Sequence, residues 1–429
     1  MGGGERAGRS DHGEFGRQDQ PDFGYELLVP AQPPISVTDA RAIAVAFVQE
    51  EAMSGTCPEW TGADVGEATP FYSTSAPHPL AYEFPLIKDG VGVGAVLCGA
   101  TEGAAAVISY SREGASIAAA LRAHVEEAVG RQVESEPRYF YGGASHFGIE
   151  VQMADAVQLP IRNDDLTVIP EERTVLYSPT FAPSTRTEWE RRFAAHYRIS
   201  RQWIEAHRQV RNDFLRSQER NRVEANASKK PEVKSGKIAL REFPHFFQTV
   251  EQWDNGTCAS GCAPLAAALV FAYWDRNGFP KMIGSKRNNS HSSPEDDDVI
   301  EALAELRRLM GTWCGANSDG VTYIRDIEDG VEAYAGDRGY TRSRATGYYS
   351  KIWSRTRDEI DEDRPPILSF SFPGGDGHAV VPYSYKDSTK DSQDELCVLW
   401  GWEEVRTRCL MVDSPTEEWK NVVRIRPKK

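Results

Sequence analysis

The feature that most constrains this chain is a polar loop, residues 257–261, that leads directly into an apolar stretch beginning at Cys262. Pro264 suits the first turn of a helix, because the amide that proline lacks would have no helical partner there. Residues 265–273 are apolar on nearly every side, which predicts a buried helix that ends near Gly278. The sequence therefore predicts a thiol at the positive end of a buried helix, where the helix dipole favours the nucleophilic thiolate.

A single cysteine is more often a small buried core residue than a nucleophile. For nucleophilic catalysis it needs a base that ionises near neutral pH, which points to histidine. The C-terminal part of the chain contains His245, His291 and His378. His378 follows the glycine-rich residues 373–377 and starts an apolar strand, so that a substrate can approach it closely. We therefore predict that His378 is the base.

The composition argues against several classes of protein. The formal net charge is −15, whereas general nucleic-acid binding needs a basic face. No apolar run is long enough to cross a bilayer. The seven cysteines are few for the length and include no CxxC pair or cysteine–histidine cluster at zinc spacing. We therefore expect no disulfide framework, no structural zinc and no cofactor.

The chain divides into four predicted segments. Residues 1–24 are rich in Gly, Asp and Arg and are expected to be a disordered tail. Residues 25–183 contain a helix followed by antiparallel strands, including a hairpin at Asp89-Gly90, which predicts a small α+β domain. Residues 184–237 are predicted as a connecting helix and linker. Residues 238–429 contain helices followed by a meander of strands, which predicts a second α+β domain with helices packed on an antiparallel sheet.

The second domain carries short motifs in an order that resembles the papain-like cysteine peptidase superfamily, in particular its bacterial bacteriocin-processing-type and streptopain-type branches. The matching stretches cover about 190 residues and are Gly261-Cys262-Ala263-Pro264-Leu265-Ala266, Asp319-Gly320-Val321-Thr322, Gly339-Tyr340, Arg364-Pro365-Pro366-Ile367-Leu368 and Gly377-His378-Ala379-Val380-Val381. The first domain has an opening alanine-rich helix, a hairpin at Ala81-Tyr82-Glu83-Phe84-Pro85-Leu86 and Asp89-Gly90, and a strand at Val107-Ile108-Ser109-Tyr110-Ser111. In these features it resembles the propeptide-like modules that precede streptopain-type peptidases.

The resemblance implies roles for further residues. Gln248 matches the glutamine whose side chain stabilises the developing oxyanion, with Gln252 as the alternative. Leu399 stands where streptopain-like chains have the asparagine that orients the histidine, so Asp413 is the candidate for that role. Cys258 is similar to a loop cysteine that forms a disulfide in papain. Cys314 is the partner suggested for it here, and a buried Cys258 thiol is the alternative.

The expected function is that of a papain-like cysteine peptidase, which hydrolyses peptide bonds of a protein or peptide substrate through an acyl-enzyme on Cys262. The N-terminal domain would be an intramolecular inhibitor or docking module, removed by cleavage near residues 226–237. The alternatives are a transglutaminase- or deamidase-like toxin or effector and an inactive binding protein. The N-terminus shows no secretory signal, so the chain as it stands is expected to be cytoplasmic, although the resembled family is mostly exported.

Overall fold

The computed structural model describes most of the chain. The described residues are 25–27, 33–143, 146–154, 166–179, 185–194, 198–200, 208–216, 234–253, 256–284, 296–315, 320–371, 377–387, 394–402, 406–412 and 418–428. Among these residues no helix combines the length and the hydrophobicity that crossing a membrane requires.

The N-terminal half is a sheet with helices packed against it. Helix α1 (Val37–Ser54) begins after Ser36, whose side chain caps it by accepting a hydrogen bond from the backbone amide of Asp39. Helix α2 (Ile117–Val129) is capped in the same way by Ser116. The strands are β2 (Asp64–Val65), β3 (Thr69–Tyr72), β4 (Ala81–Lys88), β5 (Val91–Gly99), β6 (Val107–Ser111), β7 (Arg138–Gly143), β8 (His146–Gln152), β9 (Leu166–Ile169) and β10 (Thr174–Tyr177).

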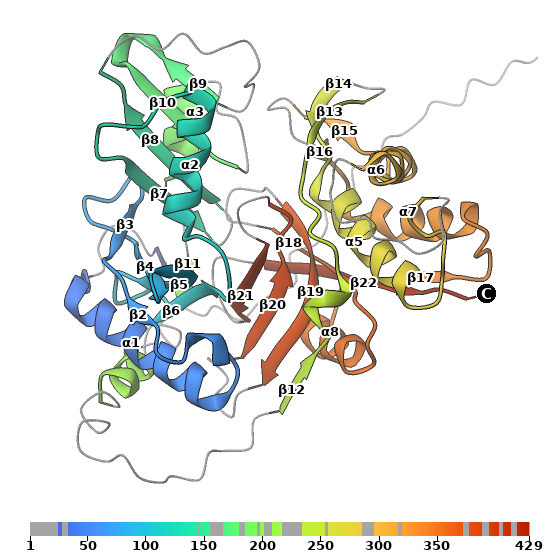
Figure 1. Cartoon of the computed structure of the whole chain (residues 1–429), viewed down its shortest axis with the longest axis horizontal. Helices are drawn as coiled ribbons and strands as arrows, with labels where there is room; N and C mark the ends of the chain where they lie inside the picture. The colour runs from blue at the N-terminus through green and yellow to red at the C-terminus, as the bar shows by residue number, and fades with distance from the viewer. Residues whose placement is uncertain are drawn as a thin grey trace, which may run out of the picture.

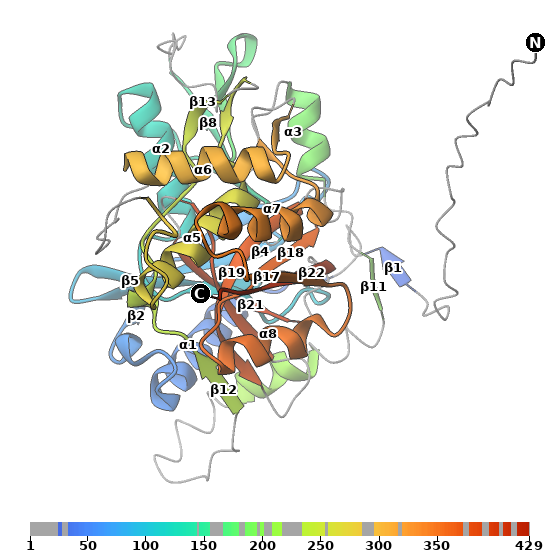
Figure 2. The same cartoon turned by 90° about the vertical axis from the view of Figure 1, so that its right-hand side faces the viewer.

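The helices of the C-terminal half lie above and below its strands in the view of Figure 2. The helices are α5 (Cys262–Arg276), α6 (Asp297–Leu309), α7 (Ile324–Asp337) and α8 (Ile352–Asp361). The strands are β17 (Arg344–Tyr348), β18 (Ile367–Ser371), β19 (Gly377–Asp387), β20 (Glu395–Leu399), β21 (Thr407–Met411) and β22 (Glu418–Arg426). Strands β18 to β21 form a meander, and β22 returns to lie between β17 and β18. The helices-first, sheet-after order agrees with the predicted α+β class.

One sheet runs through both halves of the molecule, as the central strands of Figure 1 show. Its order is β17-β22-β18-β19-β20-β21-β6-β5-β4-β3-β7-β8-β10-β9, and β3 and β7 are its parallel pair among the described strands. The halves join where β21 pairs antiparallel with β6, so that Cys409 lies opposite Tyr110 and Leu410 opposite Ser109. The two predicted α+β layers are therefore continuous through main-chain hydrogen bonds.

The segment predicted as one connecting helix is broken into separate elements. Its described parts are α3 (Arg186–Arg192), β11 (Arg198–Ser200), a helix over residues 208–216 and β12 (Lys234–Lys237). Strand β11 pairs with β1 (Tyr25–Leu27), and β12 adds to the second domain's sheet beside β19. Helix α3 ends early because Trp189 and Phe193 pack into a small core of their own with Phe140 and Leu176. The domain boundaries themselves stay a prediction.

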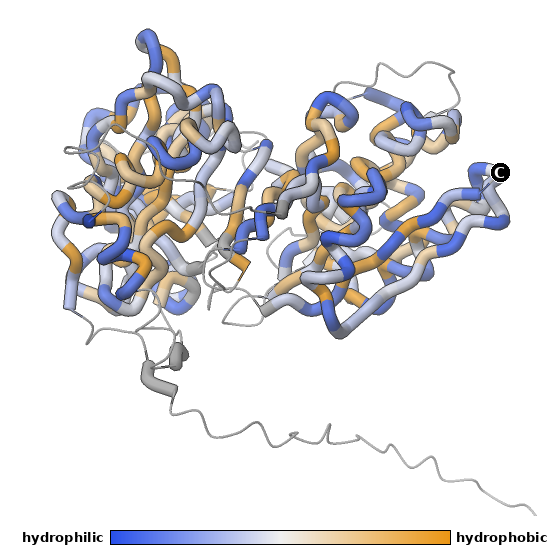
Figure 3. Tube along the Cα trace, turned by 90° about the horizontal axis from the view of Figure 1, so that it is seen from below, coloured by the Kyte–Doolittle hydropathy of each residue, from blue (hydrophilic) through white to orange (hydrophobic). Residues whose placement is uncertain are grey.

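The hydrophobic core extends through both halves. Apolar stretches of the chain run inside each half, while hydrophilic stretches lie mainly on the outer turns and helices (Figure 3). Helix α5 belongs to this core, since twelve of its side chains are buried, in agreement with the all-round apolar pattern of its sequence. The tail over residues 1–24 and most of the predicted linker lie outside the described residues.

Candidate active site

The predicted nucleophile lies at the first residue of α5, where the sequence placed it. Cys262 is partly exposed and takes part in neither disulfide of the described chain. Gly261 precedes it with a φ of +91°, and a Cβ there would lie 2.9 Å from the carbonyl oxygen of Gly320. Both the backbone conformation and the close approach require glycine. The carbonyl of Gly261 accepts the Leu265 amide at 3.1 Å, so the amide of Cys262, across the same planar peptide, points away from the helix.

A hairpin and a disulfide hold the loop in front of α5. Strands β13 (Val250–Trp253) and β14 (Gly256–Ala259) form the hairpin, and the Ser260 amide donates to the Thr249 carbonyl at 2.9 Å. Cys258 at the end of the hairpin forms a disulfide with Cys314, which lies on the short strand β15 (Trp313–Cys314) paired with β16 (Gly320–Val321). Of the two states that the resemblance left open for Cys258, the structure shows the disulfide.

His378, the predicted base, is the second residue of β19 and is 7% exposed. Its ring packs against the rings of Phe370, Trp400 and Trp402. The Nε2 atom lies 3.0 Å from the carbonyl oxygen of Trp400. Burial lowers the pKa of His378 to about 4, and the hydrogen bond to the Trp400 carbonyl opposes this effect. The imidazole is therefore neutral at ordinary pH.

Cys262 and His378 come from elements that meet at the segment after β20. Helix α5 packs against β19, and a Cβ on Gly401 would lie 2.7 Å from the Leu265 side chain in the first turn of α5. The neighbouring residue, Trp400, holds the imidazole. The nucleophile helix and the histidine thus share one contact surface, formed by residues 400–402.

Gln248 also contacts the surface formed by residues 400–402. Its backbone amide donates to the Gly401 carbonyl at 3.1 Å, and its neighbour Thr249 is bonded to the loop before Cys262. The alternative, Gln252, is engaged within its own hairpin, where its side chain donates to the Trp253 carbonyl and accepts from the Thr257 hydroxyl. These contacts favour Gln248 as the glutamine beside the nucleophile, and its catalytic role stays a prediction.

The other sequence-predicted residue, Asp413, lies outside the described residues. The Trp400 carbonyl could not be predicted as a partner of His378, because a backbone acceptor leaves no signature in the side-chain pattern. Arg307, which is buried against the loop before Cys262, was not predicted either. A buried arginine in the last turn of an otherwise amphipathic helix has the same sequence signal as a solvated one.

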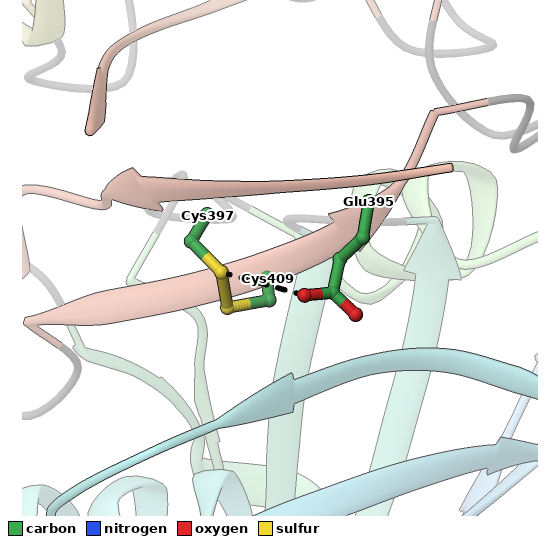
Figure 4. A group of neighbouring side chains, drawn as sticks. All are labelled: Glu395, Cys397 and Cys409. Carbon is green, nitrogen blue, oxygen red and sulfur yellow. Dashed lines mark hydrogen bonds between the residues drawn. A yellow bond between two sulfur atoms is a disulfide. The ribbon is translucent and has the colours of Figure 1, made fainter. Parts of the chain in front are cut away.

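A second disulfide, which the sequence analysis did not expect, joins Cys397 and Cys409 across β20 and β21. These are opposite residues of an antiparallel pair, so the side chains start close together. With Glu395 they form the one group of potential metal ligands among the described residues (Figure 4). Because both sulfurs are bonded to each other, they do not offer the thiolates that a zinc site needs.

A known protein family matches the C-terminal part of the chain, and one solved structure is similar to the chain. Residues 240–406 match the model of the family described as Peptidase_C39 like family. Among solved structures, a fragment of prointerpain A from Prevotella intermedia is 12% identical, with 85% of this chain and 98% of that chain covered and a TM-score of 0.38. A search of the curated proteins found no match. The family match includes Gln248, Cys262 and His378, and it supports a papain-like cysteine peptidase fold for the C-terminal half.

Proposed function

We propose that the protein is a cysteine peptidase that hydrolyses peptide bonds through an acyl-enzyme. The Cys262 sulfur attacks the substrate carbonyl, and Nδ1 of His378 accepts the thiol proton. The imidazolium then protonates the leaving amine, and a water molecule activated by the neutral imidazole releases the acyl group. The tautomer suits this sequence of steps, because an Nε2–H that donates to the Trp400 carbonyl leaves the Nδ1 lone pair available.

The oxyanion that forms during attack needs hydrogen-bond donors already in place. We assign this role to the backbone amide of Cys262 and the side chain of Gln248. The support for Gln248 is its backbone bond to Gly401, which anchors it beside the surface shared by α5 and His378.

Asp413 is the sequence-predicted residue that would orient the imidazole. The Trp400 carbonyl is the alternative for this role, because it lies within hydrogen-bond distance of Nε2, which carries a single proton. A backbone carbonyl can orient an imidazole, although it contributes less than a carboxylate to the stability of the imidazolium.

The observation that carries the proposal is the shared surface at residues 400–402, which contacts the first turn of the Cys262 helix and holds His378. The decisive variant is Cys262→Ala, assayed on casein. We expect a loss of about 10³-fold or more in kcat/KM, because the nucleophile is removed. Cys98→Ala removes a buried thiol of the N-terminal half and is expected to keep its activity. Turnover by Cys262→Ala equal to that of the wild type would contradict the proposal.

Two observations favour a second candidate, a protein of the same fold that binds peptides without cleaving them. The burial that lowers the pKa of His378 disfavours the imidazolium that the reaction must form, and Leu399 replaces the expected asparagine. Alkylation separates the candidates. A peptidase is expected to show rapid iodoacetamide labelling at Cys262 in mildly acidic buffer, whereas slow labelling comparable to an unactivated thiol favours the binding protein.

We further propose that the N-terminal domain acts as a propeptide-like inhibitor or docking module and that the chain cleaves itself near residues 226–237. Incubation of the purified chain beside Cys262→Ala tests this step. Shortening of the wild type alone supports autoprocessing, and an unchanged mass of both proteins contradicts it.

A further inference from the structure

Arg307 lies in the last turn of α6 and is buried against the loop that precedes Cys262. Its side chain is 3% exposed. The Nη1 atom donates to two successive carbonyl oxygens, those of Ala259 and Ser260, at 2.9 Å each. The Nη2 atom lies 3.3 Å from the Cys258 sulfur of the disulfide. One guanidinium therefore contacts every residue from 258 to 260.

The guanidinium is fixed from its other sides as well. It lies over the Trp253 ring at 4.7 Å from the ring centre, a cation–π contact. A Cβ on Gly320 would be 2.7 Å from Nη1 and 2.6 Å from the Gly261 amide nitrogen. The guanidinium and the Gly261 amide nitrogen thus both border the small space that the missing side chain of Gly320 leaves open. Burial lowers the pKa of Arg307 to about 10, so the group is positively charged at neutral pH.

These contacts determine the direction of the peptides that lead into α5. A peptide is planar and trans, so its N–H points opposite to its carbonyl. With the Ala259 carbonyl directed at Arg307, the Ser260 amide faces the other way and donates to Thr249. With the Ser260 carbonyl also directed at Arg307, the Gly261 amide is turned away from it. The position of Cys262 then follows, because only one residue separates it from this fixed pair.

We propose that Arg307 is the positioning residue of the nucleophile loop, and that its guanidinium both fixes the peptides before Cys262 and keeps a positive charge behind the thiolate. This inference rests on the proposed function, since it assigns Cys262 as the nucleophile. Arginine suits the task better than lysine, because its planar fork satisfies several acceptors at once while a lysine offers a point charge.

The test compares Arg307→Lys and Arg307→Met with Arg308→Met. Arg308 is the next residue of α6 and its side chain is 63% exposed, so it is a matched control. The first readout is the rate of Cys262 alkylation by iodoacetamide as a function of pH, with peptide mapping to separate Cys262 from the other thiols. The second is the kcat and KM for casein. The third is the melting temperature, together with intact mass to confirm that the Cys258–Cys314 disulfide is present.

For Arg307→Met we expect alkylation at pH 6 to slow about tenfold, and the pH of half-maximal alkylation to rise by about one unit, because the thiolate loses a nearby cation. For Arg307→Lys we expect the alkylation profile to stay close to the wild type, while kcat falls about tenfold with little change in KM, because the charge remains but the fork is lost. Arg308→Met is expected to match the wild type in every readout.

Two results would overturn the inference. One is a folded Arg307→Met variant with an unchanged alkylation profile and unchanged kcat. The other, which decides the case if Arg307→Met does not fold, is an Arg307→Lys variant with wild-type kcat. Alkylation does not need peptide hydrolysis, so a wild-type protein that alkylates rapidly without cleaving casein would contradict the peptidase proposal while leaving the Arg307 measurement interpretable.

Discussion

At the scale of single residues, the least expected feature is the partner of His378. The Trp400 carbonyl accepts the Nε2 proton in a pocket walled by aromatic rings. A carbonyl carries no charge, so it fixes the tautomer and the ring orientation without the electrostatic support that a carboxylate would give the imidazolium. Burial therefore dominates, and the pKa of the imidazole falls to about 4 from its usual 6.5.

This pKa predicts an unusual pH profile. Below its pKa the imidazole is protonated and cannot accept the thiol proton. We therefore expect kcat/KM to fall on the acid side with a midpoint near pH 4 rather than near pH 6.5. Measurement of kcat/KM from pH 3 to 8 checks this, and an acid limb at about 6.5 would contradict it.

The variant Asp413→Asn tests which group orients the imidazole. If the Trp400 carbonyl does so, we expect the same acid limb and a loss in kcat/KM below about tenfold. A loss in kcat/KM of about 10³-fold or more would assign that role to Asp413.

At the scale of elements, the segment after β20 determines how α5 and β19 meet. Gly401 has a φ of +85°, and its missing side chain makes room for Leu265. The carbonyl of Gly401 accepts the Gln248 amide. One glycine thus brings together the helix of the nucleophile, the strand end that holds the histidine and the candidate oxyanion residue.

Gly401→Ala is therefore expected to impair both stability and activity. The added methyl group overlaps the Leu265 side chain at 2.7 Å, so α5 or the strand end must move, at a cost of about 1–3 kcal/mol in addition to the backbone strain. Gly278→Ala is the control, since its φ is +100° and its surroundings are open; it is expected to cost only the strain, about 1–2 kcal/mol. Denaturant unfolding and kcat/KM check this. Equal losses of activity in the two variants would contradict a specific role for Gly401.

Much of the C-terminal half could be predicted from local sequence signals. Helix α5 begins at the predicted cysteine and ends two residues before Gly278, and β18 to β21 form the predicted meander of strands. Helix α6 begins at Asp297 with Asp296 as its cap, and its exact start could not be predicted because several neighbouring acids can cap a helix. The connecting helix predicted within residues 184–237 is divided instead, because Trp189 and Phe193 pack in one cluster and Val210 and Phe214 in another.

What the sequence could not predict depends on contacts between distant segments. The β6–β21 register joins residues about 300 positions apart, and no local pattern specifies which strand edge meets which. The Trp400 carbonyl and the contacts of Arg307 are of the same kind, because both involve backbone atoms that every residue possesses. Gln248 was named, and the Cys258–Cys314 disulfide suggested, only through the resemblance to a family; the structure shows the disulfide, and the role of Gln248 stays a prediction.

At the scale of the whole molecule, buried polar pairs cross the junction between the two halves. Tyr110 of β6 donates to Glu395 of β20, and Lys386 of β19 pairs with Glu51 of α1. Glu51 and Glu395 are 2% and 3% exposed, so two carboxylates share one buried cluster. Burial and the charge of Glu51 raise the pKa of Glu395 to about 7. The other groups facing this cluster are Arg112, Cys57, Glu59 and the Cys397–Cys409 disulfide.

This cluster predicts that the junction becomes more stable as the pH falls. A carboxyl whose pKa is higher in the folded state than in the unfolded chain stabilises the fold below its ordinary pKa, and this stabilisation is lost as the pH rises from about 4.5 to about 7. Glu395→Gln keeps the size of the side chain and cannot ionise. We therefore expect the variant to melt at a higher temperature than the wild type at pH 8. Between pH 5 and 8 its free energy of unfolding should fall less steeply with pH, the difference in slope being at most about 1.4 kcal/mol per pH unit.

Thermal melts at pH 5, 6, 7 and 8 measure this difference. Glu134→Gln, which changes an exposed acid of the first half, is the control and should follow the wild type. Parallel curves for Glu395→Gln and the wild type over this range would contradict the prediction.

The pairing of β6 with β21 also bears on what a cut between the halves would produce. A nick between residues 216 and 234 would leave two chains that still share hydrogen-bonded neighbouring strands and a common apolar interior. Such a nicked molecule is expected to elute as one particle in gel filtration and to come apart only in denaturant. Dissociation of the first chain would expose the unpaired main-chain N–H and C=O groups of β21, and such an edge readily pairs with a strand of another molecule.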